Sequence, residues 1–149
     1  MFFMHASLDG YVATLNGELN WIRIDDELFD YVATMTDAAD TALYGRVTYE
    51  MMEAYWPTAG KKPDATKHDI EHSMWYDKVA KVVLSRTMVE TGLKNTKVIS
   101  NNLSENIAEL KQQPGKNILI FGSPRASHSL LNAGLIDEFR IFINPVLLG

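Results

Sequence analysis

The chain has 149 residues, of which 46% are hydrophobic and 22% charged, with a formal net charge of −5. This size and composition predict one domain over residues 1–149 with a sizeable core, and the acidic balance disfavours nucleic acid and anionic membranes as partners. The absence of cysteine excludes disulfides and Cys-based zinc sites and is typical of the reducing cytoplasm, where we expect the protein to reside.

The two ends of the chain resemble interrupted strands. Residues 2–6 predict a short buried first strand, and the lack of a basic segment before them argues against a signal peptide. The apolar run at residues 145–149 resembles the end of a strand with a turn just begun. We therefore expect the native chain to begin a residue or two earlier and to continue past Gly149. No apolar stretch is long enough to span a bilayer.

A long loop follows the first strand, with turns predicted at Asp9–Gly10 and Asn16–Gly17. Such loops often act as lids or bind ligands, and a surface hairpin is the alternative. Residues 25–35 predict a helix with one apolar face. The acidic residues of its first turn suit the positive end of the helix dipole, or one of them points into a pocket.

Two strand–glycine–helix units recur along the chain. In the first, residues 41–44 form a strand, Gly45 the turn and residues 46–54 a helix. In the second, an apolar run ends at Gly122, Ser123 is expected to cap the helix, and Pro124 suits its first position.

Each of these helices has an arginine in its first turn, Arg46 in one and Arg125 in the other. A cation there opposes the helix dipole, so an anionic ligand explains it better than helix stability does. Helix N-termini bind phosphate readily. The alternative is an ordinary strand–helix junction with a surface arginine.

The region from residue 55 to residue 77 carries loop signals, with a short helical turn predicted at residues 68–75. Its HDIEH sequence places His68 and His72 four residues apart, but the order is not HExxH and no third ligand is evident. We therefore expect no metal site and interpret both histidines as surface residues. His128 is likewise expected on a helix surface.

The remaining elements alternate strand and helix. Strands are predicted at residues 78–84, 95–100 and 135–144, and an amphipathic helix at residues 103–111. This order predicts an α/β fold, a doubly wound and mostly parallel sheet with helices on both faces. Ligands are expected beyond the carboxyl ends of its strands.

The sequence resembles the dihydrofolate reductase-like superfamily, and more closely the reductase (RibD C-terminal) domain of bacterial riboflavin biosynthesis. The motifs that carry the resemblance span the chain in order: SLDGYVA at residues 7–13, GRVTYE at 45–50, VVLSR at 82–86, IFGS at 120–123, GLIDEFR at 134–140 and NPV at 144–146. The resemblance implies a three-layer sandwich, a twisted sheet with an antiparallel terminal strand, and NADPH as cofactor.

The resemblance also implies roles for individual residues. Gly45, Arg46 and Thr48 would hold the cofactor pyrophosphate, and Gly122, Ser123, Pro124 and Arg125 the remaining phosphate, although two adjacent glycines are usual in this family. Leu84, Ser85 and Arg86 would meet the adenosine, with Arg86 on the 2′-phosphate, while Ala6 and the loop from Asp9 to Gly17 would flank the nicotinamide. Arginine suits phosphate through its planar fork of donors.

On the substrate side, Trp21 and Asp26 have the spacing of the tryptophan and carboxylate of dihydrofolate reductases. Asp26, with Asp25 as its rival, would assist protonation of a substrate nitrogen from a mostly apolar pocket. Asp9, Trp21, Asp25 and Phe29 are the expected substrate contacts.

The predicted function is NADPH-dependent reduction of a small heterocycle, either a ribose-phosphate pyrimidine or dihydrofolate. Residues 55–77 contain no arginine for a folate tail. The alternative functions are a non-catalytic nucleotide-binding or interaction domain and a phosphosugar- or nucleotide-binding enzyme without redox chemistry. Family resemblance also implies a homodimer through residues 141–143 and 146–148, for which plain core packing is the alternative.

Overall fold

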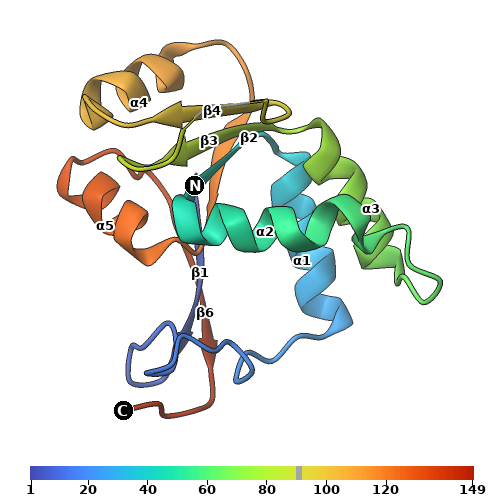
Figure 1. Cartoon of the computed structure of the whole chain (residues 1–149). Coiled ribbons are helices and arrows are strands. Elements are labelled where there is room, and N and C mark those ends of the chain that lie inside the picture. Colours follow the sequence, from blue (N-terminus) through green and yellow to red (C-terminus); the bar gives the residue numbers. More distant parts are fainter. Residues whose placement is uncertain (90–91) are drawn as a thin grey trace.

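The computed structural model describes residues 1–89 and 92–149. Within these residues one six-stranded sheet has the order β4-β3-β2-β5-β1-β6 and is flanked by five helices (Figure 1). The strands are β1 (Phe2–Ser7), β2 (Ala39–Gly45), β3 (Ala80–Leu84), β4 (Thr96–Ile99), β5 (Asn117–Phe121) and β6 (Phe139–Asn144). The helices are α1 (Asp26–Asp37), α2 (Arg46–Ala59), α3 (Lys67–Lys78), α4 (Leu103–Gln112) and α5 (Pro124–Asn132). None of the described helices is long and apolar enough to cross a membrane.

All pairings in the described sheet are parallel, so the expected antiparallel terminal strand is wrong. The last strand, β6, runs alongside β1 with Phe2 opposite Phe139 and Ser7 opposite Asn144. The reason is α5, which follows β5 and returns the chain to the end of the sheet at which β5 began. A helix used in this way makes the next strand parallel.

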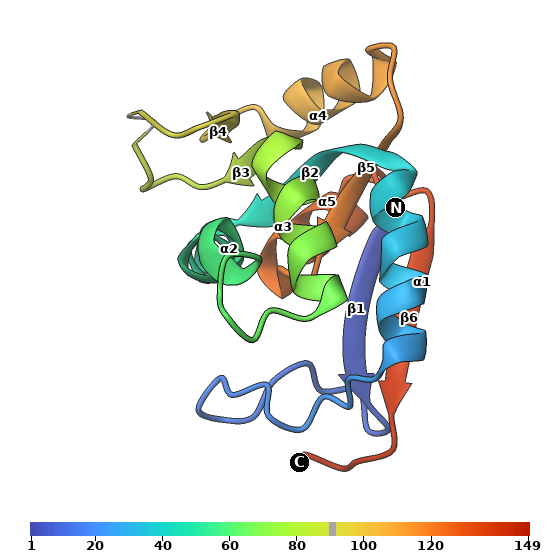
Figure 2. The ribbon, with the colours of Figure 1, turned by 90° about the vertical axis from the view of Figure 1, so that its right-hand side faces the viewer.

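Helices cover both faces of the sheet, as the sequence predicted. Side chains alternate along each strand: Ala42, Tyr44 and Leu119 pack with α1, α2 and α3, whereas Leu43 and Ile120 pack with α4 and α5. Figure 2 shows α1 and α3 in front of the strands, α2 nearly end-on beside them, and α5 behind them. The helices that follow β2 and β5 therefore lie on opposite faces.

The region from residue 55 to residue 77 is more helical than predicted. The second helix continues through Pro57 to Ala59, and α3 has three turns. The start of α3 is fixed by a capping box in which the Thr66 hydroxyl accepts the Asp69 N–H and the Asp69 carboxylate accepts the Thr66 N–H. Such a box is a start signal for a helix.

His72 is buried, so its predicted surface position is wrong. It lies on the inner side of α3, where its ring centroid is 4.0 Å from that of Trp56 and 5.8 Å from that of Phe121. Burial, and to a smaller extent the nearby His68, lowers the pKa of His72 from 6.5 to about 3. The neutral imidazole is therefore the form that fits this core.

The edge strand β6 exposes Ile141 and Ile143. Core packing is thus the wrong interpretation for these two side chains. The homodimer implied by the family resemblance stays a prediction.

We expect His72 to make the fold sensitive to acid. Below pH 6.5 the unfolded chain binds a proton at His72 that the folded chain binds only near pH 3, so stability falls with pH across that window. Between pH 7 and pH 5 the wild type should lose about 2 kcal/mol more than His72→Phe. Urea unfolding at both pH values measures the difference. The exposed control His128→Gln should behave as wild type, and an equal loss in His72→Phe would contradict the assignment.

Candidate functional site

The candidate site opens at the carboxyl ends of β2 and β5. These strands are neighbours in the sheet, yet α2 leaves β2 toward one face and α5 leaves β5 toward the other. Open α/β sheets bind ligands outside the carboxyl ends of the strands at such a change of direction. Both strand–glycine–helix units singled out in the sequence meet there.

The two units are joined by the hydroxyl of Ser123. Its Oγ accepts the N–H of Gly45 at 3.0 Å and donates to the carbonyl of Phe121 at 3.1 Å. Ser123 stands at the N-cap position of α5 but caps no helical N–H, so the predicted capping role is wrong. The left-handed backbone at Ser123, with φ +54°, accompanies this different use of the hydroxyl.

The turn before α5 has open space beside Gly122. Gly122 also has φ +54°, and a Cβ there would meet no atom within 4 Å. At Gly45 a Cβ would lie 3.4 Å from the Cβ of Ala126, because the starts of α2 and α5 pack closely. Glycine at 122 thus serves the left-handed backbone, and it leaves room for a ligand beside the helix end.

The starts of α2 and α5 differ from those of the other described helices. Both lack a side-chain cap and an acidic residue in the first turn. By contrast, α1 and α3 have both, and α4 has Glu105 in its first turn. The first N–H groups of α2 and α5 are therefore open to an external acceptor. Together with the two helix dipoles, these N–H groups favour the binding of an anion with at least two acidic groups.

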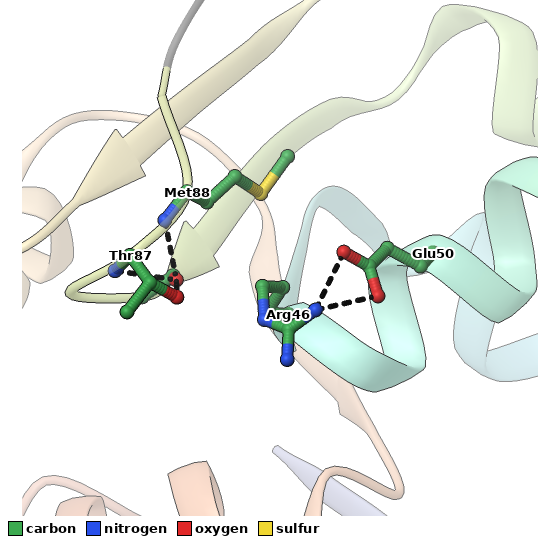
Figure 3. Close-up of polar contacts among 5 residues, drawn as sticks. Arg46, Glu50, Thr87 and Met88 are labelled. Atoms are coloured by element: carbon green, nitrogen blue, oxygen red, sulfur yellow. Dashed lines mark hydrogen bonds and ion pairs between the residues drawn. The ribbon is translucent and has the colours of Figure 1, made fainter.

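The arginines lie around these helix ends. Arg46 opens α2 and is paired with Glu50, while Arg86 and Arg125 are exposed. Gly45 is opposite Leu84 in the sheet, so Arg46 and Ser85 follow adjacent strand ends, and Thr48 is half-buried in the first turn of α2. The Ser85 hydroxyl accepts the N–H groups of Thr87 and Met88 and so shapes the turn around Arg86 (Figure 3).

The two candidate acids on α1 have different surroundings. The Asp25 carboxylate caps the helix by accepting the N–H of Leu28 at 3.0 Å. The next residue, Asp26, is exposed at the first helical position. An apolar pocket around Asp26 is therefore not formed here, but its carboxylate is the one of the two that does not serve as the cap.

The other predicted substrate contacts are partly engaged within the protein. The Trp21 indole N–H donates to the carbonyl of Glu18 at 3.1 Å. The Phe29 ring stacks on His68, with centroids 3.7 Å apart and an 8° interplanar angle. This stack joins α1 to α3 and shows the kind of flat ring that Phe29 accepts.

Asp9 joins the loop after β1 to the last residues of the chain. Its carboxylate accepts the Ser7 hydroxyl and the N–H groups of Leu148 and Gly149. The Ser7 bond first, and the Gly149 N–H next, lower the pKa of Asp9. Ala6 is buried at the end of β1, and Gly17 makes a turn with φ +80°.

The sequence alone did not predict a role in this region for two residues, Glu50 and His68. The spacing from Arg46 to Glu50 was visible as an i,i+4 pair. No local signal placed His68 on Phe29, because that contact joins two helices. Within residues 1–89 and 92–149, no three His, Asp or Glu side chains are arranged to hold a metal ion.

The RibD C-terminal domain family model matches residues 1–149. Two Bacillus subtilis (strain 168) proteins, both uncharacterized, are similar along almost the whole chain. YyaP is 34% identical over 146 residues, 96% of this chain and 72% of that protein. YwjB is 26% identical over 148 residues, 99% of this chain and 76% of that protein.

Solved structures share the fold of this chain. A putative riboflavin biosynthesis protein from Shewanella sp. PV-4 aligns with a TM-score of 0.72 and 25% identity over 99% of this chain and 77% of that one. A diaminohydroxyphosphoribosylaminopyrimidine deaminase/5-amino-6-(5-phosphoribosylamino)uracil reductase from Thermotoga maritima shares the fold, with a TM-score of 0.63 and 14% identity over 99% of this chain and 45% of that one. The resemblance inferred from the sequence motifs is thereby confirmed.

We expect Ser123→Ala to destabilise the protein by roughly 1–3 kcal/mol, because it leaves the half-buried Gly45 N–H without its partner. Ser123→Gly should lose about 1 kcal/mol less stability than Ser123→Ala, since glycine adopts the left-handed backbone more readily than alanine. Urea unfolding of the two variants beside Ser129→Ala, an exposed serine on the same helix, measures this. Wild-type stability of Ser123→Ala would show that the bond contributes nothing.

Proposed function

This chain belongs to the RibD C-terminal domain family, and we propose that it is an NADPH-dependent reductase of a small heterocyclic substrate. The observation that carries the proposal is the pair of uncapped, acid-free helix starts side by side at the carboxyl ends of β2 and β5. A dinucleotide has two linked phosphates, and two adjacent helix N-termini suit such a group.

The residues around the carboxyl ends of β2, β3 and β5 fit this cofactor. The N–H groups at the start of α2, with Arg46 and Thr48, would hold one phosphate. Those at the start of α5, with Arg125, would hold the other. Arg86, exposed at the end of β3, would pair with the 2′-phosphate and so select NADPH over NADH.

When bound, the nicotinamide supplies the hydride. The protein's own part is to orient the substrate, exclude water and deliver a proton. Asp26 would pass that proton to the substrate, since the Asp25 carboxylate serves as the helix cap. Phe29 would support the flat heterocycle, as it supports the His68 ring in this structure.

The substrate class we propose is a ribose-phosphate pyrimidine of riboflavin biosynthesis or a related heterocycle. Membership of the RibD C-terminal domain family supports this class. Titration with NADPH and NADH, followed by nicotinamide fluorescence, tests the cofactor. A panel of heterocycles assayed by NADPH oxidation tests the substrate. If the protein does not bind NADPH at submillimolar concentration, the reductase proposal is wrong.

Arg86→Gln should weaken NADPH binding about tenfold or more, because a charge-assisted bond to the 2′-phosphate is lost. NADH lacks that phosphate, so its affinity should stay unchanged. Fluorescence titration with both cofactors gives the two dissociation constants. Lys97→Gln, an exposed position on β4, controls for the loss of one positive charge, and an equal effect on NADH would contradict the role of Arg86.

Asp26→Asn should slow hydride transfer to the true substrate about a hundredfold or more, because the proton donor is lost. Asp25→Asn is the matched control, since asparagine caps helices about as well as aspartate. Single-turnover oxidation of bound NADPH measures the step. Unchanged hydride transfer in Asp26→Asn, or an equal loss in Asp25→Asn, would show that Asp26 is not the donor.

A further inference from the structure

An ion pair on the first turns of α2 holds Arg46 by one nitrogen. Nη1 donates to both carboxylate oxygens of Glu50, at 2.8 and 2.9 Å. Figure 3 shows Nη1 turned to Glu50 and the other terminal nitrogen pointing away from it. Among the described residues, no other group accepts a hydrogen bond from the Arg46 guanidinium. The N–H groups of Nε and Nη2 are therefore available to a ligand.

Helix stability does not explain this pair. Arg46 is the first residue of α2 and Glu50 lies one turn further on. The favourable order on a helix is the reverse, with the acid nearer the N-terminus and the base nearer the C-terminus. Both side chains are exposed, and exposed pairs add little to stability. The pair is better explained by what it does to the arginine.

We propose that Glu50 is a positioning residue, which holds Arg46 so that its Nε–Nη2 edge is presented to a phosphate at the start of α2. This inference rests on the proposed function. The Nε–Nη2 edge carries two parallel donors, which match two oxygens of a phosphate. A mobile arginine loses its rotamer freedom when it binds, whereas one already held by Glu50 loses less.

Two effects of Glu50 on an anion have opposite signs. Its negative charge repels a phosphate, so removing that charge would tighten binding if charge dominated. Its hold on Arg46 favours binding, so removing that hold would weaken it. Positioning should dominate, because the carboxylate is exposed and lies beside Nη1, where solvent and salt screen it from the phosphate.

A second pair in this chain provides a matched control. Lys67 and Glu71 on α3 have the same order and the same spacing, at 3.8 Å. However, the start of α3 is closed by the capping box of Thr66 and Asp69, so it offers no anion site. Glu71→Gln therefore removes the same charge from a looser pair of the same order and spacing, without touching a phosphate site.

The test compares Glu50→Gln with wild type in titrations of NADPH and of ADP, which carries a diphosphate but no nicotinamide. We expect Glu50→Gln to bind both about threefold to tenfold more weakly, the effect of releasing one long side chain. In an Arg46→Gln background the same change should have no effect. Glu71→Gln should bind as wild type, and thermal unfolding of Glu50→Gln should be unchanged.

Equal or tighter binding by Glu50→Gln, or an effect that persists without Arg46, overturns the positioning role. Failure of the proposed function looks different, because wild type then binds no NADPH. The ADP titration decides the inference in that case. Weaker ADP binding by Glu50→Gln, dependent on Arg46, supports it, and an absent or unchanged ADP affinity overturns it.

Discussion

The buried hydroxyl of Ser123 connects the two halves of the candidate site. It lies between the carbonyl that ends β5 and the N–H that ends β2, where these two neighbouring strands send their helices to opposite faces of the sheet. The starts of α2 and α5 are thereby held next to each other. A ligand that needs two groups of backbone N–H donors meets them already assembled, which lowers the ordering cost of binding.

Much of the fold was readable from local signals. The strand ends at Gly45 and Gly122, the Pro124 helix start and the amphipathic helices agree with the structure within a few residues. The direction of β6 was not readable, because pairing with β1 joins residues far apart in sequence. The buried position of His72 was missed because α3 itself was underestimated, and its capping box uses Asp69 where Glu or Gln is more usual.

The sequence predicted which types of residue form the site better than it predicted their contacts. Arginines in first turns indicated an anion, and the helices that carry them have neither a side-chain cap nor an acidic residue in the first turn. Sequence could not separate Asp25 from Asp26, because the difference lies in backbone geometry: Asp25 is extended at the N-cap and Asp26 is helical. Nor could it show that Ser123 bonds across to β2, since that depends on a left-handed backbone.

The placement of β1 has a consequence for how the chain reaches its fold. Its partners are β5 and β6, which begin at Asn117 and Phe139. Among the six described strands, β1 is therefore synthesised first but is one of the last to be paired, whereas β2, β3 and β4 adjoin one another and lie earlier in the chain than β5 and β6. Closing such long loops slows folding. Until then the apolar side chains of Phe2, Phe3 and Met4 lack their place in the sheet, and the nascent chain is most prone to aggregate.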